Sequence, residues 1–492
     1  MADISRAAPS VAIVGGGFGG IGTAAALRRA GIDDVVVLER GERVGGVWNQ
    51  NTYPGAACDV PSHLYSYSFA RNPRWGRRFA TQPEIQRYVE SVARQHGVFD
   101  RVRLGTDVTS ATWDPDSARW QLETDGGAVE ANVLVCACGQ LTRPAIPRLE
   151  GLERFAGPAF HSSQWRHDVD LRGLRVGVLG SGASSIQFVP AIQPLVRSMT
   201  VVQRTPPWIL PKPDRAYRPF DTALFERFPA AQLAGRFGFW AFLEAGIAGF
   251  IGHDAAMRPL AAISRAHLRR QVSDPELRRK LTPTYKMGCK RVLLSSDWYP
   301  ALAAPSVEVV TGGVAEVTET GIVLGDGREI ELDALIFGTG FRTREFVAPM
   351  RIAGRDGRTL EEVWSDLPHA WHGLAVPGLP NMFLIYGPNT FGGSGSAIYM
   401  IESQMRHVVA AVGALRRTGA RAIEVREDAH DAFMAELRDR QRRTVWATGG
   451  CSSWYVDEQG RDPTNWPGYT YDYRRRTARV TPDVYTLEPA GA

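Results

Sequence analysis

Apolar residues along the 492-residue chain gather into short runs that end at glycines, and two of these runs repeat one local pattern. Residues 11–22 read VAIVGGGFGGIG, and residues 176–187 read VGVLGSGASSIQ. Each begins as a β-type stretch, turns at Gly-x-Gly and continues into small residues that favour a helix. The sequence therefore predicts two strand–turn–helix–strand units. Their helices are expected over 19–30 and 183–195, and their second strands over 35–39 and 199–203.

Three further apolar runs end in glycine and are expected to be strands. They are 133–139 (VLVCACG), 334–340 (ALIFGTG) and 382–387 (MFLIYG). Residues 214–280 instead favour helix, and their apolar part, 237–252, contains Glu244 and is too short to span a bilayer comfortably. We favour a buried helix that lines a pocket, with a membrane-touching patch as the alternative. The tail after Cys451 is expected to be an ordered, loop-rich cap rather than a regular helix.

Composition describes a folded chain of two or three domains, with 44% apolar and 22% charged residues. Its net charge of +5 is too dilute to indicate a nucleic-acid partner. The five cysteines are an odd number without a CxxC pair, which argues against a disulfide framework, a zinc site or any other metal centre. The first ten residues lack an apolar leader, so we expect a cytoplasmic protein with no obligatory membrane contact.

The first glycine turn has the spacing of a dinucleotide site. Gly15 permits the tight turn, Gly17 lets the backbone approach a pyrophosphate, and Gly20 allows close packing of the helix. Glu39 ends the second strand, where a carboxylate accepts a hydrogen bond from a ribose hydroxyl. Strand, turn, helix and acid in register predict a nucleotide site.

The second turn has Gly180, Gly182 and Ser185 in the same positions but no acid after it. No Asp or Glu occurs from 183 through 213; Arg204 ends the strand instead, with Lys212 beyond it. A cation at this position suits the 2′-phosphate of NADP. Two dinucleotide units, one with an acid and one with a base, predict a flavoprotein that binds FAD first along the chain and is reduced by NADPH at the second site.

Two longer segments carry a family resemblance. Residues 45–59 resemble the signature Gly-Gly-x-Trp-x4-Tyr-Pro-Gly-x3-Asp of the type I Baeyer–Villiger monooxygenases, a class B flavin-dependent family. Residues 155–165 resemble that family's Phe-x-Gly-x3-His-x3-Trp fingerprint, although Arg166 stands where Pro or Asp is usual. The matching positions are Gly45, Gly46, Trp48, Tyr53, Pro54, Gly55 and Asp59, then Phe155, Gly157, His161 and Trp165.

Further segments extend the resemblance over nearly the whole chain. Lys290-Arg291 resembles a pair whose arginine sits over the flavin, and 338–341 resembles a glycine turn of the second domain. Residues 387–390 resemble a segment near the flavin ring, and Ser453-Trp454 resembles a pair whose indole reaches NADP. The turns and the resemblance together give these cofactor-binding residues: Gly15, Gly17, Phe18, Gly20, Glu39, Gly46, Trp48, Asp59, Tyr65, Gly180, Gly182, Ser184, Ser185, Arg204, Lys290, Arg291, Asn389 and Trp454.

The resemblance implies an NADPH- and O₂-dependent conversion of a ketone to an ester or lactone through a C4a-peroxyflavin. Arg291 and Asp59 are the catalytic candidates. Arg291 would keep the peroxide anionic and stabilise the oxyanion of the adduct, because a guanidinium stays charged and offers several donors in one plane. Asp59 would pair with Arg291 and hold its orientation. For His161, a hinge or hydrogen-bonding role is favoured over that of a general base.

The expected fold is α/β, with two Rossmann-like dinucleotide-binding domains, one for FAD and one for NADPH, and a helical insertion. The FAD domain is assigned to both ends of the chain and the NADPH domain to the middle. The predicted boundaries are 1–150 and 371–492 for the FAD domain, 151–213 and 281–370 for the NADPH domain, and 214–280 for the insertion.

Two other functions remain open at this point. One is a flavin monooxygenase that oxidises sulfur or nitrogen in soft nucleophiles, against which Trp165, Asp59 and Arg291 speak. The other is a reductase that passes electrons to a protein or disulfide, for which the chain has no CxxC. The partners implied are a small-molecule ketone and O₂, with no protein partner. Aromatic residues within 214–280 favour a bulky apolar ketone.

Overall fold

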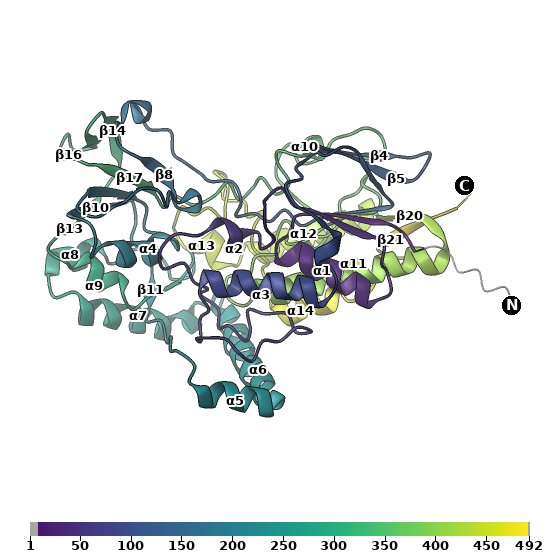
Figure 1. Ribbon diagram of the computed structural model, residues 1–492, viewed down its shortest axis with the longest axis horizontal. Helices are drawn as coiled ribbons and strands as arrows, with labels where there is room; N and C mark the ends of the chain where they lie inside the picture. Colours follow the sequence, from purple (N-terminus) through teal and green to yellow (C-terminus); the bar gives the residue numbers. More distant parts are fainter. Residues whose placement is uncertain (1–7, 491–492) are drawn as a thin grey trace.

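The computed structural model describes residues 8–490, and two five-stranded parallel sheets organise them (Figure 1). The first sheet has the order β19-β7-β1-β2-β3, and every neighbouring pair is parallel. Its three central strands are apolar along their length because both faces are covered, one by helices and the other by the mixed sheet that contains β4 (Val108–Asp114) and β5 (Arg119–Thr124). The strands are β1 (Val11–Val14), β2 (Val35–Leu38), β3 (Val102–Arg103), β7 (Val133–Cys136) and β19 (Met382–Leu384).

Helices from both ends of the chain cover this first sheet. The helix after the first glycine turn, α1, packs against α11 from the C-terminal part of the chain. Figure 1 shows the purple α1 and α3 beside the yellow-green α11. These helices are α1 (Phe18–Arg29), α3 (Gln82–Gln95), α11 (Ala397–Thr418), α12 (Glu427–Gln441) and α14 (Thr470–Arg476).

The second parallel sheet has the order β13-β10-β9-β17-β8 and lies at the other end of the molecule (Figure 1). Two helices, α4 (Ser185–Ile192) and α9 (Trp298–Leu302), pack against each other over it. Its strands are β8 (Ala159–His161), β9 (Arg175–Leu179), β10 (Ser198–Gln203), β13 (Val307–Thr311) and β17 (Ala334–Phe337). Both strand–turn–helix–strand units of the sequence analysis are confirmed, although α4 is shorter than predicted because it begins at Ser185 and ends at Ile192.

Smaller elements complete the fold. A mixed sheet has the order β18-β4-β5-β6, and an antiparallel one has the order β14-β15-β16. Two strand pairs, β11 with β12 and β20 with β21, stand apart. These strands are β4 (Val108–Asp114), β5 (Arg119–Thr124), β6 (Val129–Ala131), β11 (Ile209–Leu210), β12 (Leu293–Leu294), β14 (Val314–Thr318), β15 (Gly321–Leu324), β16 (Glu329–Glu331), β18 (Arg351–Ala353), β20 (Ala420–Val425) and β21 (Tyr485–Pro489). The short helices are α2 (Val47–Gln50), α10 (Leu360–Val363) and α13 (Val445–Thr448).

Residues 214–280 are helical, as predicted, but their apolar helix is not wholly buried. Phe237 and Phe242 on α6 are 65% and 70% exposed, whereas Phe250 is buried. The expectation of a buried helix is therefore wrong for the outer face of α6. No helix within residues 8–490 is long and apolar enough to cross a membrane. The helices are α5 (Pro219–Arg227), α6 (Pro229–Gly246), α7 (Arg258–Gln271) and α8 (Pro275–Lys280).

The tail differs in part from the expectation. Residues 451–469 have no regular helix or strand, but α14 and the strand β21 follow them. The tail packs into the core through Trp466 and Tyr473, both at most 2% exposed. The prediction of a cap without regular helix is therefore wrong beyond residue 469.

Candidate functional site

A cavity of about 1720 Å³ receives both glycine turns and the catalytic candidates. The residues at the carboxyl ends of β1 and β9 line it, and the carboxyl ends of the strands are where open α/β sheets bind ligands. The predicted residues that line it are Gly15, Gly17, Phe18, Glu39, Gly46, Trp48, Asp59, Tyr65, Gly180, Gly182, Ser184, Arg204, Lys290, Arg291 and Trp454.

The first turn leaves no space for side chains at two of its glycines. Gly15 has φ +106°, and a Cβ there would lie 2.5 Å from the Ala137 carbonyl oxygen. A Cβ on Gly20 would lie 1.8 Å from the Gly15 carbonyl oxygen. The turn therefore closes tightly on α1 and leaves the N-terminus of that helix facing the cavity, which fits a pyrophosphate.

Glu39 stands at the end of β2 and lines the cavity, as predicted. Its Oε2 accepts a hydrogen bond from the Gly16 amide at 2.6 Å, and its Oε1 accepts one from the Gly41 amide at 2.7 Å. The two amides fix the orientation of the carboxylate. Each carboxylate oxygen has a second lone pair, so the group still fits a ribose hydroxyl.

Three aromatic side chains form one wall of the same end of the cavity. The Trp48 indole donates a hydrogen bond to the Tyr65 hydroxyl at 3.1 Å. The ring of Phe18 lies 5.3 Å from that of Tyr65 in an edge-on arrangement. These contacts make the wall rigid and largely apolar, which suits a flat ring system.

The second turn is built differently from the first. Gly180 has φ +105°, and a Cβ there would lie 2.4 Å from the Gly338 carbonyl oxygen. At Gly182 the nearest atom to an added Cβ is 3.8 Å away, so this position has room. Ser185 takes the place of the third glycine and is fully buried against Gly338, where a Cβ would lie 2.0 Å from the Ser185 Oγ. In the second turn, the close contact that requires a glycine is therefore made at Gly338 and not at the start of the helix.

Two cations stand at the mouth of this second turn. Arg204 is exposed, and within residues 8–490 no carboxylate forms a salt bridge with it. Lys290 donates a hydrogen bond to Thr205 Oγ1, and burial together with the charge of Arg204 lowers its pKa. Two like charges without an anion between them fit the 2′-phosphate of NADP.

Lys212 does not belong to this pair, contrary to the expectation. Its Nζ lies 5.1 Å from the centre of the Phe79 ring. Burial lowers its pKa, and Asp214 and Asp59 are the carboxylates that act on it. The β-strand pair of β11 with β12 turns the chain after Arg204, and this carries Lys212 away from the nucleotide site and towards Asp59.

Arg291 and Asp59 form the predicted ion pair. The Arg291 Nε donates to Asp59 Oδ2 at 3.0 Å, and Nη2 donates to the same oxygen. Each side chain is 29% exposed, so both reach the cavity from a largely buried position. Burial alone would raise the pKa of Asp59, but Arg291 holds that pKa below its usual value. Both groups are therefore charged at neutral pH.

Aromatic residues that the sequence analysis missed surround Arg291. Its Cζ lies 5.4 Å from the centre of the Phe391 ring, whose own neighbours at 5.4 and 5.6 Å are Trp454 and Tyr455. Burial raises the pKa of Tyr455, and the Arg291 charge acts in the opposite direction. The Ser-Trp pair at 453–454 was the signal that pointed to this loop; nothing in the sequence marked Phe391 or Tyr455.

Three of the predicted cofactor-binding residues do not line the cavity. Gly20 and Ser185 lie beneath their turns, at the contact between helix and strand. Asn389 is 2% exposed, and its amide donates to the Asp462 carbonyl oxygen at 2.7 Å. These three residues shape the backbone around the cavity rather than face it.

His161 is a structural residue on β8, as favoured. It is fully buried, and its Nδ1 accepts a hydrogen bond from the Ser163 amide at 3.2 Å. Burial lowers the pKa of His161 to about 4. Arg166, which departs from the fingerprint, donates to Asp168 at 2.8 Å on the surface.

The segment 45–59 joins the two halves of the site. The Tyr53 hydroxyl donates to Gln187 Oε1 on α4 at 3.0 Å. A Cβ on Gly55 would lie 2.7 Å from the Gln187 carbonyl oxygen, so the segment lies directly on that helix. It starts beside the first turn at Gly46 and ends at Asp59 beside Arg291.

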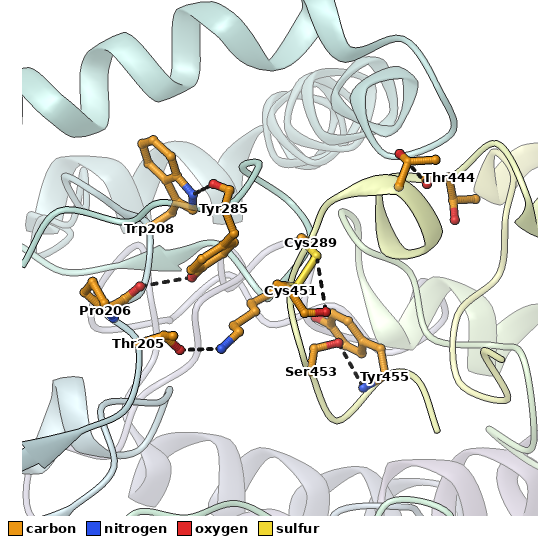
Figure 2. Close-up of a disulfide and its surroundings, with 11 residues drawn as sticks. Thr205, Pro206, Trp208, Tyr285, Cys289, Thr444, Cys451, Ser453 and Tyr455 are labelled. Carbon is orange, nitrogen blue, oxygen red and sulfur yellow. Dashed lines mark hydrogen bonds between the residues drawn. A yellow bond between two sulfur atoms is a disulfide. The ribbon is translucent and has the colours of Figure 1, made fainter. Parts of the chain in front are cut away.

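The sequence argued against a disulfide framework, but two of the five cysteines form one disulfide that it did not predict. Cys289 and Cys451 are bonded, with their Cα atoms 6.2 Å apart (Figure 2). They lie 162 residues apart in sequence, so neither spacing nor a CxxC pattern could reveal the pair. Cys58, Cys136 and Cys138 are free.

Comparison with known proteins finds similar sequences and similar structures. Residues 12–220 match a family described as pyridine nucleotide-disulphide oxidoreductase. A Baeyer-Villiger monooxygenase of Pseudomonas aeruginosa is 46% identical, over 97% of this chain and 91% of its own length. Among solved structures, cyclohexanone monooxygenase from Rhodococcus sp. Phi1 bound to NADP⁺ is 28% identical, with a TM-score of 0.87 over 98% of this chain and 99% of that one. A complex of OTEMO with FAD and NADP is 26% identical, with the same TM-score over 98% and 100%.

Proposed function

This chain belongs to the Baeyer–Villiger monooxygenases, and we propose that its Arg291–Asp59 pair carries the oxygen-insertion step. The enzyme is an FAD-dependent, NADPH-using monooxygenase that converts a ketone to an ester or lactone. The observation that carries the proposal is the charged guanidinium at the cavity wall, held by a carboxylate and resting on an aromatic ring.

The two nucleotides are assigned to the two turns. In this proposal the first turn, with Glu39 and the wall of Phe18, Trp48 and Tyr65, holds FAD. The second turn, with Arg204 and Lys290, holds NADPH. When FAD is bound and has been reduced by NADPH, it would activate O₂, so that one oxygen atom is inserted next to the carbonyl carbon of the ketone.

Arg291 acts on the charge that develops during this step. Its guanidinium donates hydrogen bonds towards the ketone oxygen as that oxygen becomes negative. Asp59 accepts hydrogen bonds from Nε and Nη2 of Arg291, which fixes the plane of the guanidinium. The remaining N–H groups of Arg291 are left for the ketone oxygen. Phe391 lies against the guanidinium, and Trp454 packs edge-on against Phe391. A preorganised donor of this kind acts most strongly where the transition state is most charged.

The domain assignment follows the sheets. We assign 1–150 and 371–492 to the FAD domain, because β1, β2, β3, β7 and β19 share one sheet. We assign 151–213 and 281–370 to the NADPH domain, because β8, β9, β10, β13 and β17 share the other sheet, although β18, near the end of this range, pairs with β4 of the FAD domain. The insertion 214–280 then stands between the two parts of the NADPH domain.

The expectation of a bulky apolar ketone has lost its support. None of the aromatic residues of 214–280 on which it rested lines the cavity. The identity of the ketone therefore stays outside the proposal. A cytoplasmic location and the lack of an obligatory protein partner stay predictions from the sequence.

Replacement of Arg291 tests the proposal. Arg291→Ala should still bind FAD and still be reduced by NADPH, but it should form about 100- to 1,000-fold less ester, because the oxyanion loses its donor. Stopped-flow reduction and gas chromatography of products measure the two steps separately. Arg291→Lys should rescue poorly, since a point charge lacks the planar set of donors.

Arg166→Ala is the matched control. Arg166 is also paired with an aspartate, but on the surface, so its loss should leave both steps unchanged. Ester formation by Arg291→Ala at the rate of this control would refute the role of Arg291.

A further inference from the structure

The disulfide joins the two loops that carry the proposed active-site residues. Cys289 directly precedes Lys290 and Arg291, and Cys451 lies three residues before Trp454. Figure 2 shows the bond with Thr205 on one side and Ser453 and Tyr455 on the other. Lys290 donates a hydrogen bond to Thr205. The inference below rests on the proposed function, because it gives these two loops their meaning.

Apart from this bond, the 449–456 loop has a few polar contacts with the Arg291 loop, one of which joins the side chains of Tyr455 and Arg291. The Lys286 amide donates to the Gly449 carbonyl oxygen at 3.2 Å. On its other side, the Thr343 hydroxyl donates to the Trp454 carbonyl oxygen at 3.3 Å. A Cβ on Gly449 would lie 2.6 Å from the Cys289 sulfur, so the chain comes close only because this residue is glycine. The disulfide is the covalent connection between the two loops.

The two sulfurs differ in their access to solutes. Cys289 is fully buried in a cluster with Met287, Trp446 and Tyr455. Cys451 is partly exposed and lines the cavity. A thiolate or a peroxide that enters the cavity therefore reaches the sulfur of Cys451 and not that of Cys289.

We propose that Cys289 and Cys451 form a reversible redox site, opened by dithiols and closed by hydrogen peroxide. In opening, one thiolate of the dithiol attacks the Cys451 sulfur and releases Cys289 as a thiol; the second thiolate then frees Cys451 and leaves the dithiol as its own disulfide. In closing, peroxide oxidises Cys451 to a sulfenic acid with loss of water, and Cys289 displaces a second water to form the bond.

The two redox states differ in how the site is held. In the disulfide form, the loop of Trp454 is tied to the loop of Arg291. In the dithiol form, the tie is lost, so NADP⁺ binds more weakly and water enters. Hydrogen peroxide is the product that leaks when oxygen transfer fails. The site thus responds to the enzyme's own leakage by closing again.

Peptide mapping of the holoenzyme tests the chemistry without reference to activity. Purified protein is treated with dithiothreitol, desalted without air, and divided; one part then receives hydrogen peroxide. Free thiols are alkylated and the tryptic peptides identified by mass spectrometry. We expect the 289–451 link before reduction, two alkylated cysteines after it, and the link again after peroxide. Alkylation of both residues in the untreated or the peroxide-treated protein would overturn the proposal.

In the same samples, NADP⁺ affinity and the coupling of NADPH oxidation to ester formation test the consequence for catalysis. The reduced form should bind NADP⁺ about three- to tenfold more weakly, because a preorganised loop is lost, and should divert a correspondingly larger share of NADPH to hydrogen peroxide. The double variant Cys289→Ser/Cys451→Ser should match the reduced form and show no response to dithiothreitol. Cys136→Ala, which removes a buried thiol outside the pair, should retain the response of the wild type.

The outcomes separate the two proposals. Equal coupling and equal NADP⁺ affinity in the oxidised and reduced wild type, with ester formed by both, would overturn the redox site alone. No ester from either form, with the disulfide mapped as expected, would instead count against the proposed function.

Discussion

The two glycine turns share one sequence pattern, yet the charged residue beside each turn is held in a different way. At the first, a side chain at Gly20 would overlap the Gly15 carbonyl oxygen at 1.8 Å, and Glu39 is fixed by two backbone amides. At the second, Ser185 stands at the matching position and Gly338 supplies the space for its side chain, while Arg204 is exposed without a carboxylate partner among residues 8–490. Both turns are tight at their first glycine, but the first holds its charged group with two backbone amides, whereas the second presents an exposed cation.

This difference bears on how long each nucleotide is expected to remain bound. A site closed by backbone contacts and aromatic rings binds through shape and releases its ligand slowly. A site that relies on exposed cations gains affinity from charge, which solvent and salt weaken. We infer that the first turn holds a resident cofactor and the second a nucleotide that enters and leaves in each cycle.

The largest expected effect comes from filling the first turn. Gly20→Ala should destroy FAD binding, since the new methyl group has no space and overpacking of this kind costs about 3 kcal/mol or more. The ratio of FAD absorbance to protein measures it. Gly182→Ala, a change at a position of the second turn that has room for a methyl group, should purify with its flavin. A yellow Gly20→Ala protein with full flavin content would remove the contrast between the two turns.

The second prediction removes the charge of the second turn. Arg204→Ala should raise the KM for NADPH about ten- to hundredfold and change that for NADH little, because a charge-assisted contact with the 2′-phosphate is lost. Steady-state kinetics with both nucleotides measures the effect. If both KM values rise together, Arg204 does not read the phosphate.

Salt offers a third and smaller test. Raising ionic strength from about 0.05 to 0.5 M should increase the KM for NADPH about threefold, because exposed charges are screened. Flavin content should not change over this range, since the first turn does not depend on free charge. Loss of FAD in parallel with the rise in KM would contradict the contrast. Potassium chloride titration of activity and flavin fluorescence gives both readouts.

The smallest effect is expected at Ser185. Its Oγ is buried without a hydrogen-bond partner, so Ser185→Ala should change the free energy of unfolding by less than about 1 kcal/mol. Denaturant unfolding followed by fluorescence measures it. Gly338→Ala is the informative counterpart, because its Cβ would meet the Ser185 Oγ at 2.0 Å. Strong destabilisation by Ser185→Ala would show that the hydroxyl has a role that its surroundings do not suggest.

The sequence revealed what local chemistry determines. Glycine spacing, an acid or a base at a strand end, and the Lys290-Arg291 pair all predicted residues that line the cavity. Positions whose role depends on distant backbone were misjudged. Asn389 follows Gly387 and Pro388 in a segment with a family resemblance, but its amide donates to the Asp462 carbonyl oxygen. Ser185 occupies a motif position, yet Gly338, far along the chain, supplies the space.

Pairings across long loops were beyond prediction. Lys212 is eight residues from Arg204, but the turn between β10 and β11 directs it towards Asp59. The bond between Cys289 and Cys451 lies beside Gly449, where a Cβ would come within 2.6 Å of the Cys289 sulfur. Such contacts are set by tertiary geometry, which apolar periodicity does not encode.

The position of β19 at the edge of the first sheet has a consequence for how the protein is made. This strand pairs with β7, although the entire second sheet lies between them in the chain. During synthesis, β1, β2 and β7 emerge from the ribosome long before β19 and α11 exist to cover them. An uncovered strand edge of this kind invites association between chains. The first sheet is therefore started early in synthesis but completed only after β19 has been made. The site proposed for the flavin is covered only once α11 has followed.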